Sequence, residues 1–375
     1  MGNDFVTIFM CGDVMTGRGI DQILPHPSDP TLHERYVKDA RGYVRLAEEA
    51  NGTVPYPVGP SYIWGDALEE LERVSPDVRL INLETSITKS DAYWKGKGIH
   101  YRMHPENVSC ITAAKIDCCA LANNHVLDWG YAGLIETLET LEGANVRGAG
   151  AGRTLEEAEA PAMMAVEGKG HVIVFSLGSE TSGIPRSWAA REKKPGVNLL
   201  PDLSARTIGH IQKEVQEVKK QGDIVVASIH WGGNWSYEVP PEQLHFAHEL
   251  IDRAGVDVIH GHSSHHVKGF EVYHGKLILY GCGDFLTDYE GITGYEAFRD
   301  DLGLMYFATV EASTGKLTSL RMTPTELRRL RVNGASAADA RWLRDLLNRE
   351  GRQFGTRVEL TEDNELVLCE WGEDG

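Results

Sequence analysis

The sequence Leu121-Ala122-Asn123-Asn124-His125-Val126-Leu127-Asp128-Trp129-Gly130 joins two segments of different hydrophobic pattern. The apolar run 116–122 predicts a buried strand, and the apolar spacing within 131–141 predicts a helix. Ligands bind at such strand ends in open α/β sheets. An asparagine amide oxygen can bind a metal ion, His125 can transfer a proton, and Asp128 can orient its imidazole. The alternative interpretation is an asparagine-rich turn that caps the helix.

Composition and charge exclude several classes of partner. The 375 residues are 42% hydrophobic and 25% charged, which is ordinary for a soluble globular protein. With 55 acidic against 37 basic residues, the net charge of −18 disfavours nucleic acid and anionic membranes as partners. An anionic substrate therefore needs local cations, such as metal ions or a few arginines. The six cysteines lack CxxC spacing, which indicates reduced core residues instead of disulfides or a zinc cluster.

The N-terminal sequence and the hydropathy pattern predict a cytoplasmic protein. Residues 1–4 lead directly into the apolar segment 5–11, without the basic and long apolar regions of a signal peptide. The chain also lacks an uninterrupted run of about 18 apolar residues, the length that a membrane-spanning helix needs. We therefore expect no direct insertion into a membrane.

Polar residues also follow four other predicted strands, namely 5–11, 78–81, 223–229 and 256–259. The residues at these strand ends are Asp13, Glu84, His230, His262 and His265. Any one of them has a structural alternative, as a turn or packing residue, but five such strand ends together indicate a site. Mixed histidine, asparagine and carboxylate ligands suit Mn, Zn or Fe. Two such ions about 4 Å apart require a bridging carboxylate.

The remaining segments predict one alternating α/β unit without repeats or a clear domain boundary. Residues 25–62 are rich in proline and are expected to form a flap over the sheet edge, with a helix at about 32–50. The glycine run 148–152 matches no phosphate-binding motif and predicts a turn. Further helices are expected at 64–74, 201–220, 243–254 and 337–350, an antiparallel pair at 302–311 and 316–322, and a hairpin at 357–371.

These motifs together resemble the CapA family of capsule or poly-γ-glutamate biosynthesis, within the calcineurin-like metallophosphoesterase superfamily. The resemblance covers about residues 5–325. It implies an α/β fold, a four-layer α/β/β/α sandwich with a dinuclear metal site at the sheet edge. We expect a CapA-like domain at 1–325, and a helix and hairpin at 326–375 packed on the same domain. The motifs are Gly12-Asp13-Val14-Met15, Asn82-Leu83-Glu84, Ala122-Asn123-Asn124-His125, His230-Trp231-Gly232 and Gly261-His262-Ser263-Ser264-His265.

The resemblance also implies a role for each site residue. Glu84 corresponds to the bridging carboxylate, and Asp13 and His265 to ligands of the first metal. His125 corresponds to the proton-transferring histidine, and Asp128 to the group that orients it. The implied metal ligands are Asp13, Glu84, Asn124, His230, His262 and His265.

The sequence departs from the superfamily pattern in ways that are typical of the CapA branch. Met15 stands where the superfamily has a histidine ligand, Glu84 replaces an aspartate, and the closing motif is stretched to Gly-His-x-x-His. Asp284 stands where CapA proteins commonly have asparagine, so it is either an extra ligand, a base or a turn residue. His266 is an alternative to His265 as ligand, although motif position favours His265.

The resulting hypothesis is a hydrolase that depends on two divalent ions and acts on a small anionic or γ-glutamyl/peptide-like substrate. Arg18, Tyr101 and Arg102 are the candidate substrate-binding residues. One alternative is a metal-dependent peptide epimerase of the type found in lasso-peptide biosynthesis, because both reactions need metal ions and an acid/base pair. The other is a non-catalytic subunit of a polymer synthase.

Overall fold

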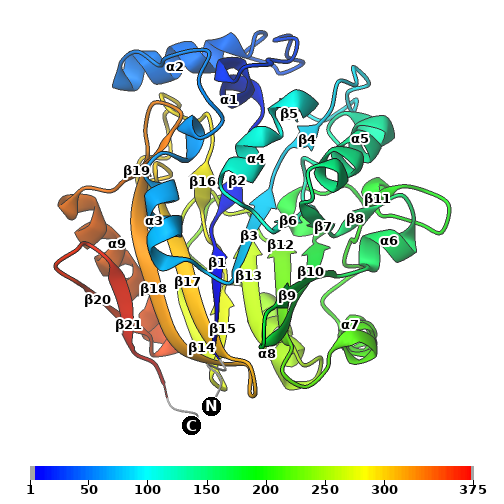
Figure 1. Ribbon diagram of the computed structural model, residues 1–375, viewed down its shortest axis with the longest axis vertical. Coiled ribbons are helices and arrows are strands. Elements are labelled where there is room, and N and C mark those ends of the chain that lie inside the picture. Colours follow the sequence, from blue (N-terminus) through cyan, green and yellow to red (C-terminus); the bar gives the residue numbers. More distant parts are fainter. Residues whose placement is uncertain (1–4, 373–375) are drawn as a thin grey trace.

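The computed structural model describes residues 5–372 of the chain, which fold as a mixed α/β protein (Figure 1). The predicted α/β class is thus confirmed. Residues 1–4 and 373–375, which are the outermost residues of the two predicted units, lie outside the described residues. The predicted absence of a signal peptide depends on residues 1–4 and stays a prediction.

The larger sheet of the described chain has 11 strands. Its main path runs β16-β2-β3-β1-β17-β18-β21-β20, while β6 and β7 extend it from β3 and β19 pairs with β18. The strands β16, β2, β3, β6 and β7 are parallel, whereas β17 runs antiparallel to β1. Their bounds are β1 Phe5–Met10, β2 Asp13–Val14, β3 Val78–Leu83, β6 Cys118–Ala120, β7 Arg147–Ala149, β16 Asp284–Leu286, β17 Leu302–Glu311, β18 Lys316–Leu327, β19 Val332–Gly334, β20 Arg357–Leu360 and β21 Leu366–Glu370.

The second sheet has six strands in the order β14-β15-β13-β12-β10-β9. Its four central strands are parallel, so the carboxyl ends of β12 and β13 lie at the same edge. Two further pairs are short, β4 Ser86–Ile87 with β5 Arg102–Met103, and β8 Ala151–Gly152 with β11 Gly196–Val197. The bounds in the second sheet are β9 Ala162–Val166, β10 Gly170–Gly178, β12 Ile224–His230, β13 Val258–His262, β14 Phe270–Tyr273 and β15 Lys276–Leu279.

The helices lie around the two sheets, with α1 and α2 together at one end of the molecule (Figure 1). Helix α7 shows why these segments are helical, because its buried residues Ile208, Ile211 and Val215 recur at helical spacing while the opposite face is polar. The bounds are α1 Arg18–Ile23, α2 Arg41–Asn51, α3 Ala67–Val74, α4 Ser109–Ala113, α5 Gly130–Gly143, α6 Leu155–Glu159, α7 Ala205–Val218, α8 Pro241–Asp252 and α9 Ala337–Glu350.

Strand alternation divides the apolar side chains into three buried clusters. Along β1, Ile8 and Met10 join a cluster with residues of β10, β12 and β13 in the second sheet, such as Val226. Phe9 points the other way, into a cluster that includes Leu134 of α5. A third cluster packs the outer face of the second sheet against α7 and α8. Successive side chains of a strand point to opposite faces of its sheet. Apolar residues occupy both sets of positions, so each sheet is apolar on both faces.

The predicted helix at 32–50 is wrong over its first half. The helix α2 begins only at Arg41. The preceding residues form a loop, in which the Leu32 N–H donates to the Lys38 carbonyl at 2.9 Å and Thr31 bridges Asp39. Backbone hydrogen bonds that close this loop replace those that a helix would make.

The C-terminal segment packs on the same core as the sheets. The apolar cluster between the two sheets includes Leu343 and Leu347 of α9 and Val358 of β20. The predicted boundary at 325 falls within β18, and the division into two units stays a prediction. Among residues 5–372, no helix is both long and apolar enough to traverse a bilayer. The cytoplasmic location stays a prediction as well.

Candidate metal centre

Four strand ends bring predicted ligands to one edge that the two sheets share. Asp13 opens β2, and Glu84 directly follows the neighbouring β3. His230 and His262 end β12 and β13, and the parallel register places them side by side. The ligand atoms of Asp13, His230 and His262 all lie within 4.8 Å of one another, although the residues come from both sheets.

Gly12 allows Asp13 to reach this position. A Cβ atom on Gly12 would lie 1.9 Å from the carbonyl oxygen of Gly283, so only glycine fits between the two backbones. The Asp13 N–H donates to that same carbonyl at 2.9 Å. The close approach sets Asp13 opposite Asp284, its register partner on β16.

Hydrogen bonds fix the direction of the Asp13 carboxylate. Asn82 donates through Nδ2 to Oδ1 at 2.7 Å, and the Ser263 N–H donates to Oδ2 at 3.2 Å. Asn123 in turn donates to the Asn82 side-chain oxygen at 3.1 Å, which fixes the orientation of that amide. Ser263 has φ +97°, a conformation that L-residues rarely adopt. Such strain concentrates at functional sites because the surrounding structure must hold it in place.

The imidazoles of His230 and His262 face each other, with their Nδ1 atoms 2.7 Å apart. The hydroxyl of Ser228 contacts the other nitrogen of His262, Nε2, at 2.9 Å and leaves Nδ1 directed at the shared space. Burial lowers the pKa of both histidines well below the usual value, and neighbouring histidines add to the effect. The neutral imidazole is the form of histidine that can bind a metal ion.

Asn124 and Glu84 lie beside this histidine pair. The Asn124 Oδ1 atom is 3.2 Å from Nε2 of His230. Glu84 Oε1 is 3.9 Å from the same nitrogen and 3.7 Å from Nε2 of His125. The structure therefore places Glu84 between the histidine pair and His125.

The carboxylates carry more negative charge than this buried environment favours. Burial, followed by the charge of Asp284, raises the pKa of Asp13 to about 7. Burial and then Asp13 raise the pKa of Glu84 well above its usual value. A divalent cation between them would offset this repulsion, because an opposite charge favours the ionised form. Carboxylate, imidazole and amide donors fit Mn, Zn or Fe, so the residues present are compatible with the predicted metal ions.

His125 lies against the centre and forms a buried network with Asp128. Its Nδ1 atom is 2.6 Å from Asp128 Oδ2 and 2.9 Å from Nζ of Lys97, which also pairs with Asp128. The Tyr101 ring stacks on the imidazole at 3.8 Å. Burial, with the charge of Lys97, lowers the pKa of His125 well below its usual value. With Nδ1 held, Nε2 faces Glu84 and is the nitrogen that can exchange a proton with a substrate.

His265 and Asp284 form a second contact at the same edge. Nδ1 of His265 is 3.0 and 3.1 Å from the two oxygens of Asp284. Burial opposes a charge on His265, but Asp284, together with Asp13 and Asp300, raises the pKa of the imidazole. His266, the alternative ligand, instead accepts a hydrogen bond from the Ser236 N–H and lies against Trp235. The geometry therefore favours His265 over His266.

Comparison with known proteins gives the family to which this chain belongs. Residues 7–289 match the family model described as bacterial capsule synthesis protein PGA_cap. The chain belongs to the PGA_cap family. The matched range contains every predicted site residue, and the predicted resemblance to CapA proteins is confirmed.

Relatives of this PGA_cap protein carry names from polymer biosynthesis. A probable polyglutamine synthesis accessory protein of Mycobacterium tuberculosis is 50% identical over 366 residues, which are 97% of this chain and 96% of the relative. The PGA biosynthesis protein CapA of Bacillus subtilis is 30% identical over 248 residues, 66% of this chain and 60% of the relative. The capsule biosynthesis protein CapA of Bacillus anthracis is 26% identical over 286 residues, 76% of this chain and 61% of the relative.

The three predicted substrate-binding residues are placed differently in the structure. Arg18 is buried, and its Nε donates to Asp288 at 3.1 Å while another guanidinium nitrogen donates to a glutamate. Arg102 pairs with Asp91 at 2.9 Å and also donates to two backbone carbonyls. Both guanidinium groups already have partners, whereas Tyr101 contacts the centre through His125. A substrate-binding role stays a prediction for all three.

Sequence reasoning missed Lys97 and Ser228. Lys97 stands in a polar loop between two glycines, where nothing in the local pattern indicates that its charge is buried. Ser228 did carry a signal, because it precedes His230 by two residues on a strand and therefore shares its face.

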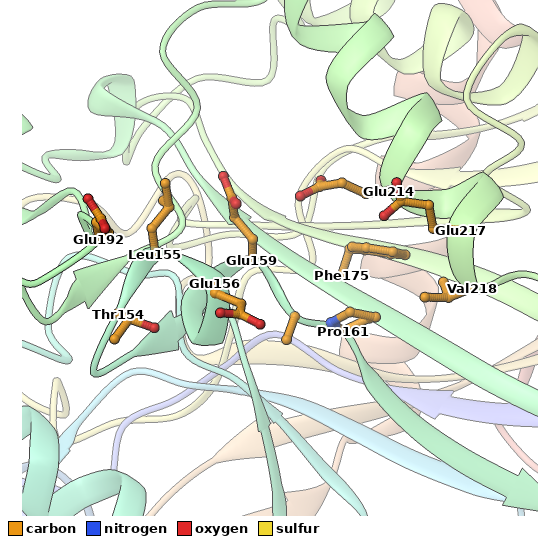
Figure 2. Close-up of a pocket in the computed structure, with 11 residues that line it drawn as sticks. Thr154, Leu155, Glu156, Glu159, Pro161, Phe175, Glu192, Glu214, Glu217 and Val218 are labelled. Atoms are coloured by element: carbon orange, nitrogen blue, oxygen red, sulfur yellow. The ribbon is translucent and has the colours of Figure 1, made fainter.

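A cavity of about 630 Å³ lies away from this centre, beside α6 and α7, and is shown in Figure 2. Five glutamates are among its lining residues, including Glu159, Glu214 and Glu217. Glu159 and Glu214 also approach His210 with ligand atoms within 4.8 Å, but His210 is exposed. Carboxylates that pair with an exposed histidine need no ion, and the cavity contains no predicted site residue.

Proposed function

We propose that this PGA_cap protein is a metal-dependent hydrolase of a small anionic or γ-glutamyl/peptide-like substrate. Two divalent ions, Mn, Zn or Fe, would supply Lewis acidity and lower the pKa of a water molecule. The residues that would hold them are Asp13, Glu84, Asn124, His230, His262 and His265.

The observation that carries this proposal is the convergence of Asp13, His230 and His262 within 4.8 Å at a buried sheet edge. Three such donors from two separate sheets have no evident packing role, because apolar side chains would fill the space at lower desolvation cost. His125 adds an acid/base group, whose Nε2 faces the same space and whose Nδ1 is held by Asp128. In this role His125 would protonate the leaving group or take a proton from the attacking water.

The substrate class is inferred from the relatives and from charge. The relatives are named for polyglutamine, PGA and capsule synthesis, so a γ-glutamyl amide is the substrate bond that we propose. Because the chain has a net charge of −18, general surface attraction would not gather an anionic substrate. The bound metal ions would therefore attract its carboxylates, and Tyr101 would contact the remainder next to His125.

A metallophosphoesterase-type sandwich of four layers is part of the same proposal. The cluster shared by β1, β10 and β12 supports two sheets packed face to face. The clusters that join the outer faces to α5 and to α7 and α8 support a helical layer on each side.

A non-catalytic role in assembly is the competing interpretation, because the relative with 50% identity is named an accessory protein. It predicts that the ligands merely stabilise the fold. It predicts no turnover of any γ-glutamyl amide, whatever metal is supplied.

The test combines metal analysis with turnover for the full chain purified without chelators. We expect two transition-metal ions per chain and cleavage of γ-glutamyl amides, both lost in Glu84→Ala. His125→Ala should keep the metal ions and lose about 100-fold or more in turnover, whereas His248→Ala, which alters a histidine on α8, should behave as wild type. Unchanged turnover in both site variants would refute the proposal. Incorporation of solvent deuterium without cleavage would instead identify an epimerase.

A further inference from the structure

Asp284 lies at the candidate metal centre, and its sequence position leaves open whether it is a ligand, a base or a turn residue. It opens β16 and is the register partner of Asp13 on β2. Its side chain is only 2% exposed, and its two oxygens lie 3.0 and 3.1 Å from Nδ1 of His265. A buried carboxylate that faces another carboxylate across a strand pair is costly unless a cation compensates for it.

The charges around Asp284 are unbalanced in the described structure. Asp13 and Asp284 are register partners, the Glu84 N–H donates to the Val14 carbonyl at 3.0 Å, and all three carboxylates are buried in one region. Two buried or partly buried cations are already paired elsewhere, because Lys97 pairs with Asp128 and Arg18 with Asp288. His265 is the single cationic partner of Asp284 among the ion pairs of residues 5–372.

Met15 supplies no competing ligand at this end of the centre. Its sulfur accepts a hydrogen bond from the Gly17 N–H at 3.1 Å, and the side chain is buried in the apolar cluster beside α5. The oxygen and nitrogen donors at this end are therefore Asp13, Asp284 and His265, together with Glu84. Hard carboxylate oxygens with one imidazole suit a divalent ion such as Mn²⁺.

The spacing of Asp284 and His265 is suitable for shared coordination. Two donors bound at about 2.1 Å and at right angles on one ion lie about 3.0 Å apart. The distance of 3.0 Å between Asp284 Oδ1 and His265 Nδ1 is close to this separation.

We propose that Asp284 is a metal ligand, which with Asp13 and His265 holds one divalent ion, while His230, His262 and Asn124 hold the other. Glu84 lies between the two groups. The inference rests on the metal dependence of the proposed function and adds a residue to its metal-binding set. Under this proposal, binding of the ion held by Asp13 and His265 depends on Asp284, whereas binding of the other ion does not.

The test is titration of the metal-free full chain with Mn²⁺ by calorimetry and by electron paramagnetic resonance. We expect two sites in wild type, with the spectrum of a coupled Mn²⁺ pair. Asp284→Ala should bind one ion and show an isolated Mn²⁺ spectrum. Asp284→Asn, which keeps the size and one oxygen, should weaken one site at least tenfold and leave the other unchanged. Asp300→Asn is the matched control, because half-buried Asp300 acts on Asp284 and His265 only through its charge.

Thermal unfolding separates a ligand from a structural residue. The gain in melting temperature on adding Mn²⁺ should shrink in Asp284→Asn relative to wild type and should be unchanged in Asp300→Asn. Two sites of wild-type affinity in Asp284→Ala, or an equal loss in Asp300→Asn, would overturn the assignment and leave the proposed function intact. Absence of Mn²⁺ binding in wild type would overturn both.

Discussion

Replacement of Lys97 by methionine tests the charge network behind His125. The Lys97 ammonium group pairs with Asp128, whose side chain is fully buried, whereas that of Lys97 is 16% exposed. Removing one partner of a buried ion pair costs about 3–5 kcal/mol, because the other charge is left uncompensated. Since Lys97 is partly exposed, and Asp128 still accepts from Tyr101 N–H and contacts His125, we expect about 3 kcal/mol of lost unfolding free energy at pH 7.5.

The cost should depend on pH with a definite sign. Burial raises the pKa of Asp128 to about 6, against an ordinary value of 3.8, while Lys97 opposes this shift. The folded state therefore binds the Asp128 proton more tightly than the unfolded state, and stability falls as pH rises from about 4 through 6. Without Lys97 the pKa of Asp128 rises further, so the loss of stability with rising pH becomes larger. At pH 5 the protonated carboxyl needs no cation, so the penalty of Lys97→Met should fall to about 1 kcal/mol.

Urea denaturation at both pH values measures the effect, in a cycle with Asp128→Asn. In the Asp128→Asn background, loss of Lys97 should cost under about 1 kcal/mol, which gives a coupling energy of about 2 kcal/mol. Lys213→Met is the control, because Lys213 makes only an exposed pair with Glu217 and should change stability by less than about 0.5 kcal/mol. Additive effects of the two site substitutions, or a larger penalty at pH 5 than at pH 7.5, would refute the reasoning.

Two further predictions concern the backbone crossing at the centre and the acidic cavity. Gly12→Ala should destabilise the protein by about 3 kcal/mol or more in urea denaturation, because the new Cβ meets the Gly283 carbonyl. The control is Gly209→Ala on α7, which has open space around it and should stabilise the protein by about 0.5–1 kcal/mol. Equal effects of the two substitutions would contradict this account. Burial raises the pKa of Glu214 to about 7, so its contribution to stability falls as pH rises from about 4.5 through 7. Glu214→Gln should therefore raise the free energy of unfolding by about 1 kcal/mol at pH 8, after allowance for solvent screening, and leave it unchanged at pH 4. Thermal melts at both pH values measure this effect. The control is Glu217→Gln, which alters an exposed residue and should show no such pH-dependent gain.

Periodicity and strand ends predicted much of this protein from the sequence. Helix α9 was expected at 337–350 and is found there, because a well-capped amphipathic segment is specified by its own residues. Asp13, Glu84, His230 and His262 were expected together, since polar residues after parallel strands must meet at one sheet edge. The helix predicted at about 32–50 is wrong before Arg41, because hydrogen bonds that close a loop outweigh helix propensity there.

Only the tertiary structure decided which charges meet. The sequence places Asp284 far from Asp13, and their pairing depends on the register of β16 against β2 and on the close approach at Gly12. Likewise, local sequence does not show which groups pair with Lys97 and Arg18, but folding sets each against a distant buried carboxylate. The hydrophobic periodicity of a sequence indicates which face of an element is buried. It does not indicate which distant residue lies opposite that face. The sequence therefore determined the candidate ligands of this PGA_cap protein, whereas long-range packing determined their electrostatic partners.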